Sequence, residues 1–291
     1  IDFLYRMKMR RQNQETRDMF NKRTPIFDKF NAWKTGTPVG GGLLIILVTT
    51  IWTFWAYGVL NINPKPWETF VIFFSFIGFG LLGFLDDYKK ITGNKANFFG
   101  LRFRHKFIIQ WALALIIATV LYVQLSYSFV FIHGLGIINI GVLFIPFAAL
   151  VIVAFTNAFN ITDGLDGLAS GLFLICLVAF LIINSQIDEP LGIFLAVLMG
   201  SVAAFLYFNI YPARLWLGDV GSLSLGAVLA VIGLLTGKTL ALVIIGGVFV
   251  IEAGSSLLQL LSKKYLGRKL FSVAPFHLYL QNKGWEEPKV V

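Results

Sequence analysis

Charged side chains are scarce in this sequence. Asp, Glu, Lys and Arg make up 13% of its 291 residues, whereas hydrophobic residues make up 57%. Together with a mean hydropathy of +0.78, this composition is typical of an integral membrane protein and excludes an ordinary water-soluble domain. Cysteine is nearly absent as well. Cys176 stands alone within an apolar run, which excludes an internal disulfide and argues against thiol chemistry. The sequence has neither an initiator methionine nor a signal peptide, so we expect a fragment of a longer chain.

Long apolar runs are abundant, and eight of them are long enough to cross a bilayer. We therefore predict an all-α, polytopic membrane bundle of about eight transmembrane helices, forming a single domain over residues 1–291. Between the third and fourth runs, residues 127–138 alternate weakly around two glycines, which predicts a small external β-hairpin. The predicted spans are 39–60, 68–85, 107–126, 139–157, 168–184, 190–208, 221–236 and 239–261.

The basic residues are distributed unevenly between the two predicted membrane faces. If residues 1–38 are cytoplasmic and the spans alternate, all 24 Lys and Arg residues except Lys65 and Lys238 lie in cytoplasmic segments, including the tail 262–291. The positive-inside rule predicts this orientation. It also accounts for the net charge of +9, so we predict a membrane location and no nucleic-acid partner.

The acids that adjoin the apolar runs gather on the same predicted face. The segment 157–171, NAFNITDGLDGLASG, places Asp163 and Asp166 three residues apart, so that on a helix they would share a face. A carboxylate beside a membrane span is costly, so the default interpretation is a functional site. The plainer alternative is a polar connection between two helices in which an aspartate caps the second helix.

Two more polar insertions carry acids. Asp86 and Asp87 close the second span, with Lys90 one turn further on, and Asp219 stands between two glycines just before an apolar run. Carboxylates that hold Mg²⁺ beside bases that hold phosphate are what phosphoryl transfer requires. For the aspartate pair alone, an ordinary charge cluster at the membrane interface is at least as good an explanation.

Two remaining polar residues are harder to interpret. His277 lies in the basic tail, and we expect it to be exposed, although a lone histidine is more often incidental than functional. Glu252 is an acid within the last span, where an unpaired carboxylate is costly. The sequence does not identify its partner.

Five motifs occur in order along nearly the whole chain, and together they resemble the polyprenyl-phosphate N-acetylhexosamine-1-phosphate transferase superfamily. The resemblance is greatest to the branch that makes the first lipid intermediate of peptidoglycan. Any one motif is weak, but five at appropriate spacing are specific. They are KTGTPVGG (34–41), GFLDDYKK (83–90), NAFNITDGLDGL (157–168), YPARLWLGDVGSL (211–223) and KGWEEPKVV (283–291).

The resemblance implies transfer of phospho-MurNAc-pentapeptide from its UDP carrier to undecaprenyl phosphate, with release of UMP and a requirement for Mg²⁺. It places the active site on the cytoplasmic face of a bacterial inner membrane, in a family that is often homodimeric. The catalytic residues that it implies are Asp86, Asp87, Asp219 and His277, with Asp219 as a Mg²⁺ ligand. As a hypothesis of our own, we add Asp87 as a second ligand of the ion. The implied substrate-binding residues are Gly164, Leu165, Asp166, Asn209 and Trp216 for uridine, Lys34, Lys90 and Lys106 near the phosphates, and Asn160 and Asp163 in the same cleft.

Two departures from the family pattern leave alternatives open. The family carries three consecutive histidines where this chain has His277, Leu278 and Tyr279, so a sister enzyme that transfers another sugar phosphate, such as GlcNAc-1-phosphate, is the nearest rival. The family also has ten spans rather than eight. An ion-coupled transporter is the non-enzymatic rival, but it predicts acids at the bilayer midplane and internal repeats. Direct attack by the lipid phosphate and an aspartyl-phosphate intermediate both fit the sequence.

Overall fold

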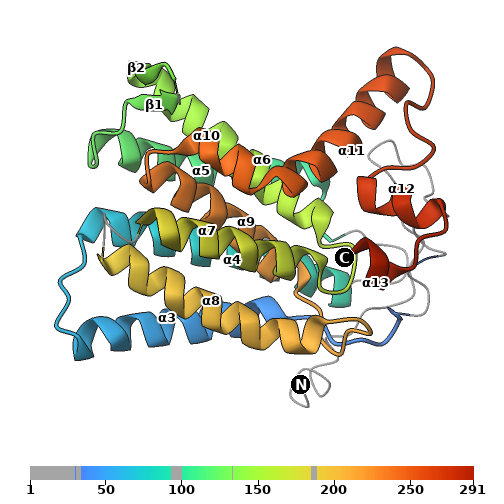
Figure 1. The fold of residues 1–291 in the computed structure, drawn as a ribbon, viewed down its shortest axis with the longest axis horizontal. Coiled ribbons are helices and arrows are strands. Elements are labelled where there is room, and N and C mark those ends of the chain that lie inside the picture. The colour runs from blue at the N-terminus through green and yellow to red at the C-terminus, as the bar shows by residue number, and fades with distance from the viewer. Residues whose placement is uncertain (1–29, 31–33, 93–99, 133, 185–188) are drawn as a thin grey trace.

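The computed structural model describes residues 30, 34–92, 100–132, 134–184 and 189–291 (Figure 1). The predicted basic segment 1–38 falls mostly outside these residues. The long helices are α3 (Gly41–Val59), α4 (Pro66–Thr92), α5 (Phe103–Val123), α6 (Phe144–Thr162), α7 (Leu168–Asn184), α8 (Glu189–Asn209), α9 (Gly218–Leu235) and α11 (Gly247–Tyr265). The short elements are β1 (Phe129–Ile132), β2 (Gly136–Asn139), η2 (Gly141–Leu143), α10 (Thr239–Ile245), α12 (Phe276–Asn282) and α13 (Glu287–Val290).

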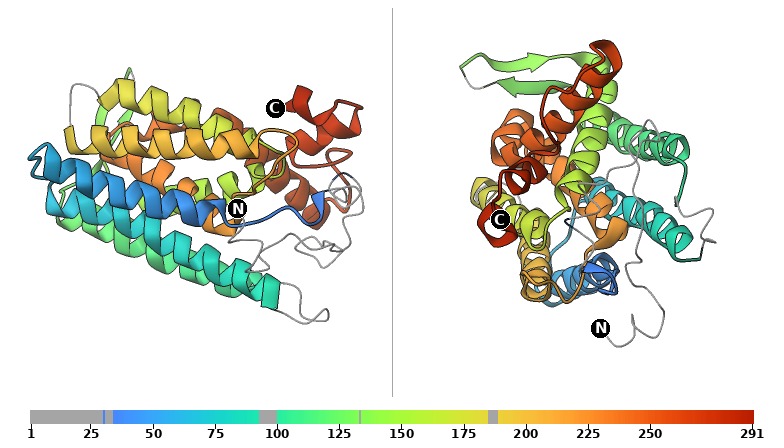
Figure 2. Two further views of the ribbon diagram at one scale, coloured as in Figure 1. Left: turned by 90° about the horizontal axis from the view of Figure 1, so that it is seen from below. Right: turned by 90° about the vertical axis from the view of Figure 1, so that its right-hand side faces the viewer.

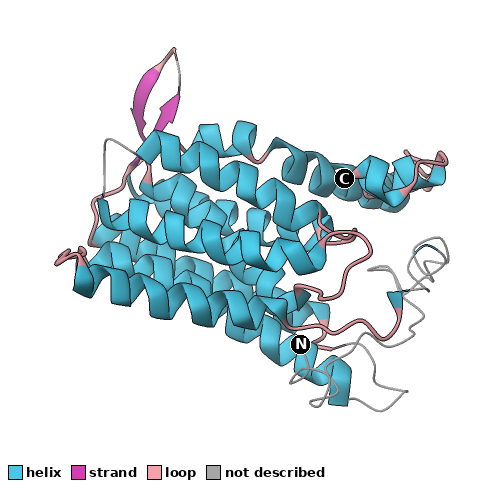
Figure 3. Cartoon of the chain, turned by 60° about the horizontal axis from the view of Figure 1, so that its bottom comes forward, coloured by secondary structure: helices cyan, strands magenta, loops and turns pink. Residues whose placement is uncertain are grey.

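The described part of the chain is a bundle of helices with one small hairpin, which confirms the predicted all-α membrane fold. Three long helices carry a proline in their first turn, Pro66, Pro146 and Pro190, where no helical hydrogen bond is lost. The hairpin is antiparallel and pairs Phe129 with Asn139, as the weak alternation predicted. It projects from one end of the bundle, whereas α12 and α13 lie at the other (Figure 3).

Six described helices are long and apolar enough to cross a membrane: α3, α4, α5, α8, α9, and α6 together with η2. The helix α7 is apolar too, but its 17 residues fall short of the roughly 20 that a perpendicular span needs. The remaining predicted span, 239–261, is not the single helix that we expected. It is broken into α10 and α11, which are bent by 81° relative to each other.

Two adjacent glycines explain this break. Gly246 ends α10 and Gly247 starts α11, and glycine weakens a helix because it loses the most backbone freedom. A Cβ atom on Gly246 would lie 2.8 Å from Cε1 of Phe155, so the chain passes too close to α6 for any larger residue. Hydropathy does not detect such a break, because glycines do not interrupt an apolar run.

The helix α9 is the centre of the bundle. Every residue from Val220 to Leu234 is buried, and α9 is packed against α4, α6 and α3 (Figure 2). The approach of α4 is closest at Gly83, where an added Cβ would lie 2.1 Å from the carbonyl oxygen of Asp219. The first turn of α9 is therefore held directly against the end of α4, where the aspartate pair lies.

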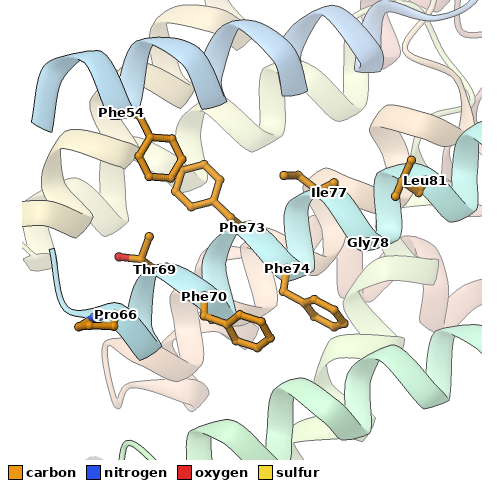
Figure 4. Close-up of a pocket in the computed structure, with 9 residues that line it drawn as sticks. All are labelled: Phe54, Pro66, Thr69, Phe70, Phe73, Phe74, Ile77, Gly78 and Leu81. Atoms are coloured by element: carbon orange, nitrogen blue, oxygen red, sulfur yellow. The ribbon is translucent and has the colours of Figure 1, made fainter. Parts of the chain in front are cut away.

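An apolar groove of about 490 Å³ lies between α3 and α4. In it the rings of Phe54 and Phe73 stack with centroids 4.7 Å apart (Figure 4). Phe73 precedes Asp86 by 13 residues of α4, or roughly 20 Å along the helix axis. The groove therefore belongs to the apolar part of the bundle. Its lining is Phe54, Pro66, Thr69, Phe70, Phe73, Phe74, Ile77, Gly78 and Leu81.

Candidate active site

The polar residues predicted from sequence lie at one end of the bundle. Helices α4, α6 and α8 finish there, α3, α7 and α9 begin there, and α12 and α13 lie beside them (Figures 1 and 2). The alternation of helices brings segments together that are more than a hundred residues apart in sequence. Two polar clusters and His277 are the features of this end that concern the site.

The first group, which we name the carboxylate cluster, contains Asp86, Asp87, Lys90, Lys106 and Asp219. The Lys90 ammonium group lies 2.8 Å from Oδ2 of Asp86, 3.6 Å from Oδ1 of Asp87 and 2.9 Å from Oδ2 of Asp219. The Lys106 ammonium group lies 3.2 Å from Oδ2 of Asp86 and 2.5 Å from Oδ2 of Asp219. Three carboxylates thus face two ammonium groups, which leaves one formal negative charge in excess.

Backbone and amide groups fix the orientation of each carboxylate. The Leu101 amide donates to Oδ1 of Asp86 at 2.7 Å, and the Val220 amide donates to Oδ2 of Asp87 at 3.2 Å. The Asn160 side chain donates to Oδ1 of Asp219 at 3.1 Å. Asp86 and Asp87 are 3% and 5% exposed, so these hydrogen bonds replace water that the buried carboxylates have lost.

The second group, the Lys34 cluster, joins four segments of the chain. The ammonium group of Lys34, which is 2% exposed, lies 2.9 Å from Oδ1 of Asp166 and 2.5 Å from Oε1 of Glu287. Oε1 of Glu287 also accepts the Asp166 amide at 2.7 Å, and Oδ2 of Asp166 accepts the Ala213 amide at 2.9 Å. Lys34 also lies 5.1 Å from the ring centroid of Trp216.

Asn209, at the end of α8, supports the loop between α6 and α7. Its Oδ1 accepts hydrogen bonds from the Gly167 amide at 3.1 Å and the Ser170 hydroxyl at 2.8 Å, while its Nδ2 donates to the Leu215 carbonyl at 3.0 Å. Asn209 is 4% exposed. The hydrogen bonds of Asn209 therefore stabilise the loop that carries Asp166.

The expectation that His277 is exposed was wrong. Its side chain is 1% exposed, and Nδ1 lies 2.9 Å from Oε2 of Glu252 on α11. Its Nε2 faces Gly164, where an added Cβ would lie 2.6 Å away. Residues 266–275 return the chain so that α12 packs against α11, which buries a residue that looked like part of a free tail.

The structure therefore brings the predicted residues into one region, but in two groups. Lys90, Lys106 and Asn160 lie with the aspartates, whereas Lys34 lies in the second cluster with Asp166 and Trp216. Asp163, Gly164 and Leu165 occupy the loop that connects α6 to α7. Asp163 and Asp166 therefore do not share a helix face, because α6 ends at Thr162 and α7 begins only at Leu168.

Sequence reasoning missed Glu287 and the partner of Glu252. Glu287 belongs to the motif KGWEEPKVV, but nothing in the motif separates it from its exposed neighbour Glu286. Glu252 was recognised as an intramembrane acid, but its partner lies 25 residues away, beyond a turn of the chain that hydropathy does not predict. The cost of a buried carboxylate was the only available signal.

The Lys34 cluster gives a prediction about stability. Replacing Glu287 by alanine should destabilise the protein by about 3 kcal/mol, because removal of one partner leaves a buried lysine incompletely paired. Glu286→Ala is the matched control, since Glu286 is exposed and precedes Glu287 directly. The measurement is thermal unfolding in detergent. Equal melting temperatures for the two variants would contradict a structural role for this ion pair.

The sequence is similar to those of known enzymes. Residues 69–237 match the family model described as glycosyl transferase family 4. The phospho-N-acetylmuramoyl-pentapeptide-transferase of Acetivibrio thermocellus is 40% identical over 267 residues, covering 89% of this chain and 77% of the relative. The enzyme of the same name from Clostridium perfringens strain 13 is also 40% identical, and the match covers 89% of this chain and 80% of the relative. The enzyme of the same name from Leptospira biflexa is 37% identical over 298 residues, and the match covers 90% of this chain and 77% of the relative.

Proposed function

This chain belongs to glycosyl transferase family 4. We propose that it transfers phospho-MurNAc-pentapeptide from UDP-MurNAc-pentapeptide to undecaprenyl phosphate and releases UMP. The product would be the first lipid intermediate of peptidoglycan. The carboxylate cluster is the observation that carries this proposal. It places two lysines and three aspartates at the end of a membrane bundle, where a soluble nucleotide and a lipid phosphate are both able to arrive.

The reaction exchanges one phosphoanhydride bond for another. An oxygen of the lipid phosphate forms a bond to the sugar-bearing phosphorus, and the bond from that phosphorus to the bridging oxygen of the diphosphate breaks. UMP leaves with the electron pair. At neutral pH the lipid phosphate is mostly a dianion, so the main task of the protein is to hold several anionic oxygens together. Lys90 and Lys106 supply positive charge, and Asp86 orients the attacking phosphate.

The donor set of the carboxylate cluster fits Mg²⁺. Among the described residues no three His, Cys, Asp or Glu side chains form a ready-made metal cage. Mg²⁺ does not need one, because it usually binds one or two carboxylates and completes its shell with water and substrate phosphates. Asp219 and Asp87 would hold the ion here, and the excess negative charge of the cluster favours it. When bound, Mg²⁺ would neutralise charge on the diphosphate.

The Lys34 cluster is a suitable place for the nucleotide. It contains Asp166 and Trp216, lies beside Gly164 and Asn209, and offers carboxylate and amide groups together with an aromatic face. Bases stack on aromatic rings and form hydrogen bonds through their edges. A nucleotide that used these groups would have to exchange some of the hydrogen bonds that they now make with the protein.

The wider setting follows from the same proposal. We expect the site to face the cytoplasm of a bacterium, because the basic residues of the sequence gather on that predicted side. No nucleic-acid partner is needed, because the positive-inside rule already accounts for the net charge of +9. A homodimer is expected from the resemblance alone, and chemical cross-linking in native membranes would test it.

The deciding experiment measures UMP release by the purified protein with undecaprenyl phosphate and Mg²⁺. UDP-MurNAc-pentapeptide and UDP-GlcNAc are supplied in parallel reactions. Turnover of the first alone supports the proposal. Turnover of UDP-GlcNAc alone would favour the sister enzyme, to which the single histidine of the run also points. Absence of turnover with both substrates, in a folded full-length protein, would overturn the proposed reaction.

A further inference from the structure

Glu252 and His277 form a buried pair outside both polar clusters. Glu252 lies on α11 and is 2% exposed, and His277 lies at the start of α12. The carboxylate accepts from the His277 backbone amide, at 3.0 Å through Oε1 and 3.3 Å through Oε2, and Oε2 lies 2.9 Å from the ring Nδ1. One carboxylate thus contacts both the backbone and the ring of the same histidine.

This arrangement determines which nitrogen of the His277 ring can accept a hydrogen bond from another group. An ionised carboxylate only accepts hydrogen bonds, so a hydrogen bond to Nδ1 requires the proton to be on Nδ1. In the neutral ring, Nε2 is then the acceptor. Within the described part of the chain, Nε2 is buried and has no hydrogen-bond partner. Buried polar atoms are usually paired, so an unpaired one calls for an explanation.

The unpaired nitrogen points toward the predicted substrate loop. Nε2 is the atom nearest to the position of a Cβ on Gly164, at 2.6 Å, and Gly164 is followed by Leu165 and Asp166 of the TDGLDGL segment. Asp166 is itself part of the Lys34 cluster. Nε2 of His277 therefore lies against the loop that borders the proposed nucleotide site. At position 164 of this loop only glycine fits, because any side chain would collide with the imidazole ring.

We propose that Glu252 is a positioning residue, which holds His277 in the Nδ1–H tautomer so that Nε2 accepts a hydrogen bond from a hydroxyl or N–H group of the donor substrate. The inference rests on the proposed function for the nature of that substrate. The tautomer of His277 depends only on the contact between Glu252 and His277. It is therefore testable without any measurement of enzymatic activity. The positioning role also explains why α11 carries a carboxylate in a predicted membrane segment, where a carboxylate without a function would be costly.

The test combines a spectroscopic and a kinetic measurement on the full-length protein. The chain has three histidines, His105, His133 and His277, so ¹⁵N-histidine labelling gives few signals, and His277→Gln identifies those of His277. In the wild type, the His277 signals should report protonated Nδ1 and unprotonated Nε2. Glu252→Leu removes the acceptor and should abolish this signature, whereas Glu252→Gln keeps a carbonyl oxygen and should retain it at least in part.

The kinetic part tests whether the tautomer matters for the reaction. Outer partners of functional histidines, as measured at metal sites, typically contribute about 10- to 100-fold, and we expect a loss of UMP release of this size in Glu252→Leu. Glu252→Gln should restore most of the activity. In a His277→Gln background, Glu252→Leu should add little further loss, because the two residues act as one unit.

Each outcome decides a separate question. An unchanged ¹⁵N signature in Glu252→Leu, or fully additive losses in the double variant, would overturn the positioning role. If the wild type releases no UMP but Glu252→Leu changes the His277 tautomer, the proposed function fails while the structural basis of the positioning role stands. Thermal unfolding of each variant shows whether the loss of the pair has merely unfolded the protein, and Glu252→Gln then remains the informative variant.

Discussion

Asp219→Asn is expected to lower the rate of UMP release on the order of a hundredfold or more. Asparagine keeps the shape of the side chain but loses the negative charge that both Lys90 and Lys106 approach. It also replaces one of the two proposed anionic Mg²⁺ ligands by a neutral amide, which binds the ion more weakly. Because electrostatic groups of this kind act mainly on charge that develops in the transition state, we expect the loss mostly in kcat.

The measurement is a titration of UMP release against Mg²⁺ concentration for Asp219→Asn and the wild type. Glu68→Gln is the matched control, because it removes one carboxylate charge from the opposite end of α4, where Glu68 pairs with Lys65 on the surface. The control should behave as the wild type. Full transfer activity of Asp219→Asn with unchanged Mg²⁺ dependence would show that this carboxylate is not part of the catalytic machinery.

Gly83→Ala should have an effect of similar size without altering any polar group. An added Cβ would lie 2.1 Å from the carbonyl oxygen of Asp219 and 2.5 Å from the Val220 amide nitrogen. These are backbone atoms, so α9 must move away from α4, and the Asp219 carboxylate must move with it. Misplacement of a reacting group by about 1 Å can lower a rate on the order of a hundredfold. Overpacking should also cost about 1–3 kcal/mol of stability.

Gly78→Ala, on the same helix, separates these effects from a general intolerance of alanine. There the added Cβ would be 3.5 Å from the side chain of Leu113, which is an ordinary contact. We expect normal UMP release and no loss of thermal stability in this variant, because alanine also favours the helix more than glycine does. If Gly83→Ala retained wild-type activity, the close contact of α4 with α9 would not be what places Asp219.

Most of the fold was predictable because hydropathy reports burial in lipid directly. The eight predicted spans correspond to helical segments of the structure, and weak alternation was enough to predict the hairpin formed by β1 and β2. The break at Gly246 was not predictable in this way, because helix continuity depends on backbone geometry and on the close approach of Phe155. Hydropathy contains neither kind of information.

For the site, sequence spacing predicted contacts only within single helices. Lys90 follows Asp86 by one helical turn, and their ion pair is the one that this spacing suggests. Lys106 and Asn160 reach Asp219 from separate helices, and only the family resemblance grouped them with it. The functional roles of these residues remain predictions for the experiments above.

The sequence by itself determined that this is a polytopic membrane protein with its acids near the ends of its spans, because composition and helical periodicity are local properties. Only the tertiary structure decided that Lys34 pairs with Glu287 and that Glu252 pairs with a buried His277. Those pairs join residues 253 and 25 positions apart, and whether they form depends on how the helices pack. A buried charge makes a partner necessary, but only the packing of the whole chain selects which residue that partner is.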